Sequence, residues 1–260
     1  MTIRKILLPL QAVGTAEAAC SVAVSVARMW SAHLSVLHVC SRRDREGALR
    51  DLVARLMAEH GLALAEATPD AATPTASFAV VAGEEPEVVA HQARLADLVV
   101  LPHPASDKEV SSSDALHAVL FESAKPVLIA PPAAPPEIGQ RVCIGWNGTA
   151  ESASAVLAAL PWLKRAKTIC ILWSEEYQRR GPLAADLQHY LAMHDLTADR
   201  AAFAPKGNAV GAGLLAAAGE RACDLLVMGA YSHSRLRQLF LGGVTRHVLA
   251  YATIPVLMHR

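Results

Sequence analysis

Short apolar runs alternate with amphipathic stretches along the first half of the chain. Apolar runs of this length, bounded by polar residues, predict buried strands. They cover residues 3–9, 34–40, 75–81, 98–101 and 127–130. Between them, apolar residues recur every three or four positions, which predicts helices at 16–31, 44–60, 86–95 and 114–123. Thr15 is the expected N-cap of the first helix.

The pattern restarts after a proline-rich stretch at 131–136. Four prolines in six residues cannot form a helix and predict an extended linker. Apolar runs then recur at 142–146, 168–173, 197–203, 225–228 and 256–259, with a helical pattern at 181–194 and another after Gly242. Two motifs also repeat in order: Thr149-Ala-Glu follows Thr15-Ala-Glu, and Asp224-Leu-Leu-Val follows Asp97-Leu-Val-Val. The chain therefore reads as a tandem duplication.

Alternation of strand and helix in each half predicts a parallel sheet with helices on both faces. The expected fold is α/β and Rossmann-like, with two tandem doubly wound five-stranded parallel-sheet domains. The expected domains are residues 1–130 and 140–260, joined by the linker 131–139. In such sheets, ligands bind beyond the carboxyl ends of the strands, where the strand order reverses.

Composition narrows the function classes. The 24 basic and 24 acidic residues balance, which argues against a general nucleic-acid or membrane-surface role. The five cysteines are scattered without metal-ligand spacing and fit buried, reduced thiols. Arg4-Lys5 before an apolar run loosely resembles a signal peptide, but Pro9 and Gln11 interrupt that run. We therefore expect a cytoplasmic protein, with no metal beyond any magnesium that arrives with a ligand.

The segment after Asp224 has the layout of an anion site. A short apolar run stops at Gly229, a polar loop follows, and Gly242-Gly243 precede a helical pattern. Backbone N–H groups at a helix N-terminus favour negative charge. From Leu225 to Arg260 the segment has four arginines and no acidic residue, in a chain that is neutral overall.

The strand order, the Asp224-Leu-Leu-Val-Met-Gly strand and the spacing from Gly229 to Gly242-Gly243 together resemble the universal stress protein family in its tandem form. The resemblance implies a loop that binds ATP phosphates through a Gly-x2-Gly-x9-Gly-Ser/Thr pattern, and an aspartate after the first strand that holds the ribose. The positions implied to bind an adenine nucleotide (ATP, ADP or AMP) are Asn147, Gly229, Ser232, His233, Arg235, Gly242, Gly243, Val244 and Thr245.

Three of these positions depart from the pattern. Ser232 replaces the second glycine, Gly243 the Ser/Thr, and Asn147 the aspartate. A neutral amide is a weaker partner for a ribose hydroxyl than a carboxylate, so we expect a weakened site. The N-terminal half has Gln11 at the aspartate position and no glycine between Gly83 and Gly139, which predicts that it has lost the phosphate loop.

Two functions remain open, and a third is disfavoured. The chain is expected to act by binding an adenine nucleotide, with at most slow hydrolysis. Alternatively, it is a regulatory or dimerisation scaffold of the same family that binds no nucleotide. Another adenine-nucleotide enzyme is disfavoured because the histidine motif of adenylyl-transferring relatives is missing. The family also implies that the last strand of each half pairs within the chain, as a pseudo-dimer, and we expect a further homodimer.

Overall fold

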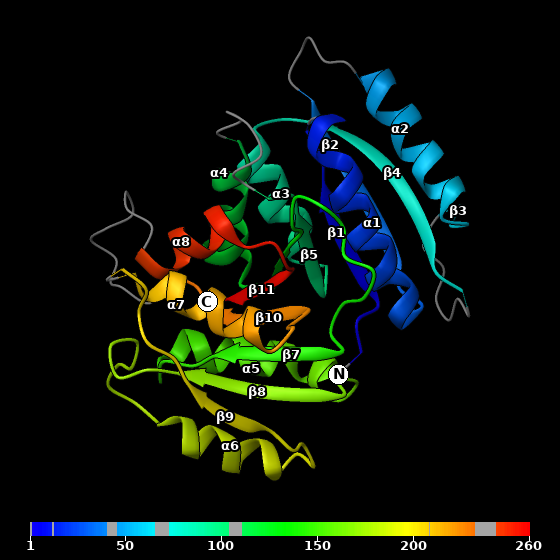
Figure 1. Cartoon of the computed structure of the whole chain (residues 1–260). Helices are drawn as coiled ribbons and strands as arrows, with labels where there is room; N and C mark the ends of the chain where they lie inside the picture. The colour runs from blue at the N-terminus through cyan, green and yellow to red at the C-terminus, as the bar shows by residue number, and fades with distance from the viewer. Residues whose placement is uncertain are drawn as a thin grey trace. The chain divides into compact units, whose positions relative to one another are not determined.

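The computed structural model describes residues 2–11, 13–40, 46–65, 73–103, 111–207, 209–231 and 243–260. The chain divides into two compact units, Met1–Ala134 and Pro135–Arg260. Within each described unit, the strands named below pair in parallel (Figure 1). The predicted α/β fold of tandem parallel-sheet domains is therefore confirmed.

The N-terminal unit places its strands in the order β3-β4-β2-β1-β5-β6. Its elements are β1 Lys5–Pro9, α1 Val13–Trp30, β2 His33–Cys40, α2 Glu46–Glu59, β3 Ala63–Leu64, β4 Thr75–Ala82, α3 Glu85–Ala93, β5 Leu98–Leu101, α4 Ser111–Ala118, the π-helical turn η1 Val119–Ser123, and β6 Val127–Ile129. Helix α1 packs with α2, and α3 packs with α4. Strand β3, two residues long at the sheet edge, is an addition to the expected five.

The C-terminal unit repeats the pattern in the order β11-β10-β7-β8-β9. Its elements are β7 Arg141–Gly145, α5 Ala150–Leu163, β8 Thr168–Trp173, α6 Ala184–Ala192, β9 Asp199–Ala202, α7 Val210–Glu220, β10 Leu225–Gly229, α8 Gly243–Tyr251 and β11 Val256–His259. The central strands β7 and β10 and the neighbouring β11 carry buried apolar side chains on both faces, as expected of a sheet covered by helices on both sides. The edge strand β9 has no buried residue.

Helices α5 and α7 cover opposite faces of this second sheet. Gly145 and Met228 are register partners, and a side chain at Gly145 would point at Leu214 of α7. Gly229, the next residue after Met228, faces the first turn of α5 instead. Successive strand residues point to opposite faces, so α7 lies on one side and α5 on the other.

Three helix boundaries differ from the expectation. Helix α1 begins at Val13, which places Thr15 inside the helix and not directly before it. Helix α6 begins at Ala184 and not at residue 181, because the Asp186 carboxylate accepts a hydrogen bond from Leu183 N (2.7 Å) and fixes the start there. The helix expected at 114–123 is α4 followed by η1, which ends where Ala124 turns left-handed (φ 50°).

Candidate functional site

The carboxyl ends of β10 and β7 lie side by side in the C-terminal unit. The two strands pair from Leu225↔Val142 to Met228↔Gly145, which brings Gly229 next to Trp146 and near Asn147. The chain leaves β7 towards β8 and β9 and later returns through β10 to the other side of β7. Gly229 and Asn147 therefore flank the reversal of strand order, where open α/β sheets bind ligands.

Gly229 allows the first turn of α5 to approach β10 closely. A Cβ added at Gly229 would lie 2.5 Å from Ser152 N and 2.7 Å from Glu151 C. Both are backbone atoms, so the helix could not make room by changing a rotamer. The glycine that the family pattern assigns to phosphate binding thus has a packing role in its own unit.

Asn147 is committed to the start of α5. Its Oδ1 accepts hydrogen bonds from Thr149 N (3.2 Å) and Thr149 Oγ1 (2.8 Å). Thr149 is the N-cap of α5, and its Oγ1 accepts from Ser152 N (3.3 Å). The side-chain oxygen that would receive a ribose hydroxyl is therefore already used by the helix cap, and only 5% of Asn147 is exposed.

Residues 174–183, between β8 and α6, form a loop that covers Asn147. Arg179 N donates to Asn147 O (2.8 Å), and Trp146 Nε1 donates to Pro182 O (2.9 Å). Trp146 is buried, so its ring has a packing role at the end of β7. The loop is thus fastened to the end of β7 by hydrogen bonds from both directions.

Two glycines make this covering contact close. A Cβ at Gly148 (φ 78°) would lie 2.5 Å from Gln178 Nε2 and 2.8 Å from Pro182 O, and a Cβ at Gly181 would run into the Gly148 carbonyl. The Asn147-Gly148 pair is therefore a turn, as its composition predicts, and the turn is packed beneath the 174–183 loop.

Tyr177 anchors the loop in the core. Its ring lies 6.0 Å from that of Phe203, centroid to centroid, and Tyr177 N donates to Ser174 Oγ (3.1 Å). Burial raises the pKa of the Tyr177 hydroxyl above its usual range. The apolar pattern predicts one helix over 181–194 and so gives no sign of this loop. Gly181-Pro182 is the signal of a turn that the sequence does offer.

The start of α8 supplies the other described part of the predicted site. Gly243 is exposed, Val244 is half-buried, and Thr245 is buried. Among the described residues, no atom lies within 4 Å of a Cβ added at Gly243. Ser232, His233, Arg235 and Gly242 lie outside the described residues. The site residues that the structure describes thus come from two places: the β7–β10 strand ends and the first turn of α8.

Tyr231 stands where the chain leaves β10. It adopts a left-handed conformation (φ 58°), which is uncommon for a residue with a side chain. Burial raises the pKa of its hydroxyl. Nothing in the apolar pattern distinguished this tyrosine from the polar loop that follows it.

The corresponding region of the N-terminal unit is a cavity of about 330 Å³. It lies beside α1, the ends of β5 and β6, and the residues that follow them. Its lining includes Glu17 of α1 together with Pro102 and His103 after β5. Pro102 occupies the position of Gly229 in the repeat, because Asp97 and Asp224 begin the matching motifs. Glu17 is matched by Glu151 in the repeated Thr-Ala-Glu motif, so the two regions differ at Pro102 and Gly229 and not in this carboxylate.

Metal ligands and membrane-spanning helices can be assessed for the described residues alone. Among them, no group of three or more histidine, cysteine, aspartate or glutamate side chains is arranged to hold a metal ion. No described helix is both long and apolar enough to cross a membrane.

The sequence model of the universal stress protein family matches residues 140–260. The C-terminal unit is a universal stress protein domain. A universal stress protein of Synechocystis sp. is 51% identical over 41 residues, which span 16% of this chain and 14% of that relative. The predicted resemblance to the universal stress protein family is thereby confirmed.

Solved structures extend the likeness of fold to both units. The crystal structure of a universal stress protein from Archaeoglobus fulgidus DSM 4304 matches 98% of this chain and 98% of its own, at 15% identity and a TM-score of 0.72. A functionally unknown protein from Pseudomonas aeruginosa PAO1 matches 99% of this chain and 92% of its own, at 17% identity and a TM-score of 0.61. At these identities the likeness is one of fold, and it agrees with a tandem arrangement of two such domains.

Proposed function

We propose that this chain is a regulatory protein that binds an adenine nucleotide in its C-terminal unit and acts by binding, not by catalysis. One observation carries the proposal: Gly229 and Asn147 lie together at the reversal of strand order in a universal stress protein domain. The excess of four arginines from Leu225 to Arg260 supports the choice of an anionic ligand.

The phosphate end is the stronger part of the proposed site. Gly243 is the exposed first residue of α8, and a helix N-terminus offers N–H groups to an anion. We assign phosphate contacts to Gly243, Val244 and Thr245 and, from the sequence pattern, to Ser232, His233, Arg235 and Gly242. ATP, ADP and AMP share this anionic end.

The ribose end is the weaker part. Asn147 Oδ1 already accepts two hydrogen bonds from Thr149, so the amide nitrogen is the side-chain atom left to contact a sugar hydroxyl. The 174–183 loop must also shift for a ribose to reach it, because Arg179 N and Pro182 O close over the turn. Both costs reduce affinity, and we expect binding at micromolar concentration or weaker.

Calorimetric titration of ATP, ADP and AMP into the full chain tests the proposal. We expect heat of binding from the wild type, and at least about tenfold weaker binding in an Arg235→Ala, Gly242→Val double variant, since one charge-assisted hydrogen bond contributes roughly 1.5–3 kcal/mol. The matched control is Lys108→Ala with Ser112→Val, which removes one charge and adds bulk in the segment of the N-terminal half that corresponds in sequence. Equal affinity in the first variant and the wild type would contradict the assigned site.

The scaffold function is favoured by a different observation, the closed packing over Asn147. The 174–183 loop packs over Asn147, the position expected to hold the ribose, so the fold of this unit needs no nucleotide to cover that position. Absence of heat from the wild type at millimolar nucleotide would establish this alternative over nucleotide binding. Pairing of the last strands of the two halves, and a further homodimer, stay predictions; light scattering at micromolar protein would contradict the homodimer by giving the monomer mass.

A further inference from the structure

Three of the five cysteines gather in the C-terminal unit, away from the carboxyl ends of the strands. Cys143 lies in the middle of β7 and is the register partner of Cys170 on β8. Cys223 lies between α7 and β10. The Cys170 and Cys223 thiols are close enough to Cys143 for hydrogen bonding with them to be the main cause that raises the pKa of Cys143. We call these three residues the thiol cluster.

The thiol cluster lies on the face of the sheet that α7 covers. Gly145 faces Leu214 of α7, and Cys143 is two residues earlier on the same strand, so it points to the same side. Register partners on parallel strands share a face, which places Cys170 beside Cys143. Arg221, directly after α7, lowers the pKa of Cys170, chiefly by its charge. Its Nη1 also donates to Ala217 O (2.9 Å) and lies 3.8 Å from a carboxylate oxygen of Glu220.

The members of the cluster differ in accessibility. Cys170 is half-exposed, whereas Cys143 and Cys223 are 2% and 6% exposed. Cys40 in the N-terminal unit is the other half-exposed cysteine, and Cys20 is buried. A solute therefore meets Cys170 first within the cluster, and Cys40 provides an internal comparison of similar exposure.

The charges around Cys170 favour its thiolate. The hydrogen bond from Cys143 lowers the pKa of Cys170, burial opposes this, and the Arg221 guanidinium lowers it further, to about 7. Asp199, its register partner on β9, acts in the opposite sense. The pKa of Cys143 is raised, first by its hydrogen bonds to the two neighbouring thiols and then by burial.

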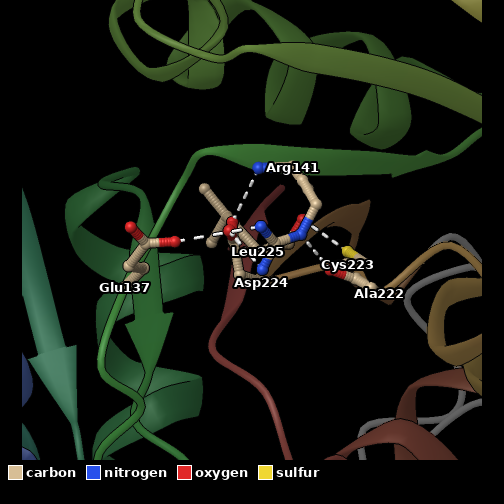
Figure 2. Close-up of polar contacts among 6 residues, drawn as sticks. All are labelled: Glu137, Arg141, Ala222, Cys223, Asp224 and Leu225. Carbon is tan, nitrogen blue, oxygen red and sulfur yellow. Dashed lines mark hydrogen bonds and ion pairs between the residues drawn. The ribbon is translucent and has the colours of Figure 1, made fainter.

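The backbone at the start of β10 fixes the Cys223 thiol. Its Sγ donates to Leu225 O (3.1 Å; Figure 2). Hydrogen bonding with Cys143 is the main cause that lowers the pKa of Cys223. The adjacent Asp224 carboxylate is paired with Arg141, through Arg141 N (2.9 Å) and its guanidinium (3.5 Å). The negative charge nearest to Cys223 is thus neutralised by a partner.

We propose that the thiol cluster is an oxidisable site at which a hydroperoxide converts Cys170 and Cys143 into a disulfide. The Cys170 thiolate attacks the terminal oxygen of the hydroperoxide; an S–O bond forms, the O–O bond breaks, and the leaving oxygen takes up a proton as water or an alcohol. Cys170 is thereby oxidised by two electrons to a sulfenic acid, and the hydroperoxide is reduced. Cys143 sulfur then attacks the sulfenic sulfur, the S–O bond breaks, and the hydroxide leaves as water with the Cys143 proton.

The register of the two strands suits this product. Neighbouring strands in a sheet lie about 4.8 Å apart, and disulfides join Cα atoms separated by roughly 4.4–6.8 Å. Cys143 and Cys170 are direct register partners, so the bond needs no shift of strand register. Packing as small apolar side chains explains Cys143 and Cys223, but it explains neither the exposure of Cys170 nor the arginine beside it.

Trypsin can map the reaction, because basic residues place the three cysteines on separate peptides: 142–164, 168–179 and 222–235. The full chain is treated with one equivalent of hydrogen peroxide, alkylated and digested. We expect the 142–164 and 168–179 peptides to be disulfide-linked, and the Cys40 peptide to remain reduced. A link between any other pair, or oxidation of Cys40 at the same rate as Cys170, would overturn the proposal.

Two variants separate the steps. In Cys143→Ala the sulfenic acid on Cys170 should persist and be trapped by dimedone, while Cys170→Ser should abolish peroxide consumption by the C-terminal unit. Failure of dimedone to label Cys170 in folded Cys143→Ala contradicts the order of steps. If Cys143→Ala does not fold, the wild-type peptide map and Cys170→Ser still decide the outcome.

A pH profile tests the contribution of Arg221. The rate of Cys170 alkylation should rise with a midpoint near pH 7 in the wild type, and Arg221→Gln should move that midpoint upward. Arg200→Gln is the matched control: it removes one arginine from the neighbouring strand β9, but follows Asp199 and so points to the opposite face. An unchanged midpoint in Arg221→Gln, or an equal shift in Arg200→Gln, would contradict the assigned electrostatics.

Discussion

The two units share the tie at the start of their sheets and differ at the end where ligands bind. In the N-terminal unit, Asp97 Oδ2 accepts hydrogen bonds from Arg4 N (2.8 Å) and Lys5 N (2.9 Å). In the C-terminal unit, Asp224 makes the corresponding bond with Arg141 N and adds an ion pair with its guanidinium. The repeated Asp-Leu-x-Val motif therefore marks the contact that ties β1 to β5 in the N-terminal unit and β7 to β10 in the C-terminal unit.

At the carboxyl ends the halves diverge. Gly229 lets α5 press onto β10, and Asn147 caps that helix through Thr149. The N-terminal half has Pro102 and Gln11 at these positions, and a cavity lined in part by Glu17 lies there. After the duplication, the two halves therefore kept the contacts that join their strands, while the residues at the carboxyl ends of the strands diverged.

The largest expected effect is that of Gly229→Ala. The new methyl group would meet the backbone of Glu151 and Ser152, so the helix or the strand must move. Overpacking of this kind typically costs 1–3 kcal/mol, and we expect about 3 kcal/mol because no rotamer change relieves it. Hydrogen-exchange mass spectrometry, which reads the two units separately, should show earlier opening of β10 and α5.

Pro102→Ala is the control for that change in the other half. Its neighbourhood is a cavity, so we expect a change in stability below about 1 kcal/mol. Equal destabilisation by Gly229→Ala and Pro102→Ala would contradict the conclusion that these two positions are packed differently.

Asp224→Ala should have the next largest effect. Asp224 is buried and loses a backbone and an ion-pair contact with Arg141, which predicts a loss of about 2 kcal/mol. Asp97→Ala removes two backbone contacts at an exposed position, where solvent screening reduces the loss to about 1 kcal/mol or less. Urea unfolding followed by tryptophan fluorescence suits Asp224→Ala, because Trp146, Trp162 and Trp173 lie in its unit. A larger loss in Asp97→Ala would contradict this ranking.

Periodicity and the repeat predicted the sheet well, because buried parallel strands leave continuous apolar runs. They could not predict β3, whose two residues are too short for a pattern, or η1, whose extra backbone residue per turn leaves no mark in apolar spacing. The position of Thr15 shows the limit of local motifs. Thr149 directly precedes α5 and caps it, whereas Thr15, in the same motif, lies inside α1.

The candidate site was less predictable because its closure depends on distant contacts. The sequence indicated that Asn147-Gly148 is a turn and Gly229 a strand end. It could not indicate that Gly181, more than thirty residues away, packs against Gly148. The thiol cluster was equally hidden, since Cys143, Cys170 and Cys223 have no motif spacing and meet only through strand register.

Asn147→Ala should have a smaller effect than Asp224→Ala. The substitution removes the acceptor for Thr149 N and Thr149 Oγ1 and loosens the start of α5, for an expected loss of about 1–2 kcal/mol. Gln11→Ala, at the matching position of the N-terminal half, is expected to change stability by less than about 0.5 kcal/mol. Thermal unfolding of both variants measures the contrast, and a neutral Asn147→Ala would show that the cap contributes little.

The smallest expected effect is a pH dependence from Tyr177. Burial raises the pKa of its hydroxyl in the folded state above the unfolded value, so its contribution to stability is complete below about pH 10. As the pH rises beyond that value, the unfolded chain loses the Tyr177 proton first, and stability falls by up to about 1.4 kcal/mol per pH unit. Tyr177→Phe should remove this part of the slope between about pH 10 and 11 in urea titrations, whereas Tyr190→Phe, at a more exposed position on α6, should retain it. Tyr177 anchors the loop that covers Asn147. An unchanged slope in Tyr177→Phe would therefore mean that this loop opens before the C-terminal unit unfolds. The carboxyl ends of the strands would then be open to ligands in both units, contrary to the difference in their packing.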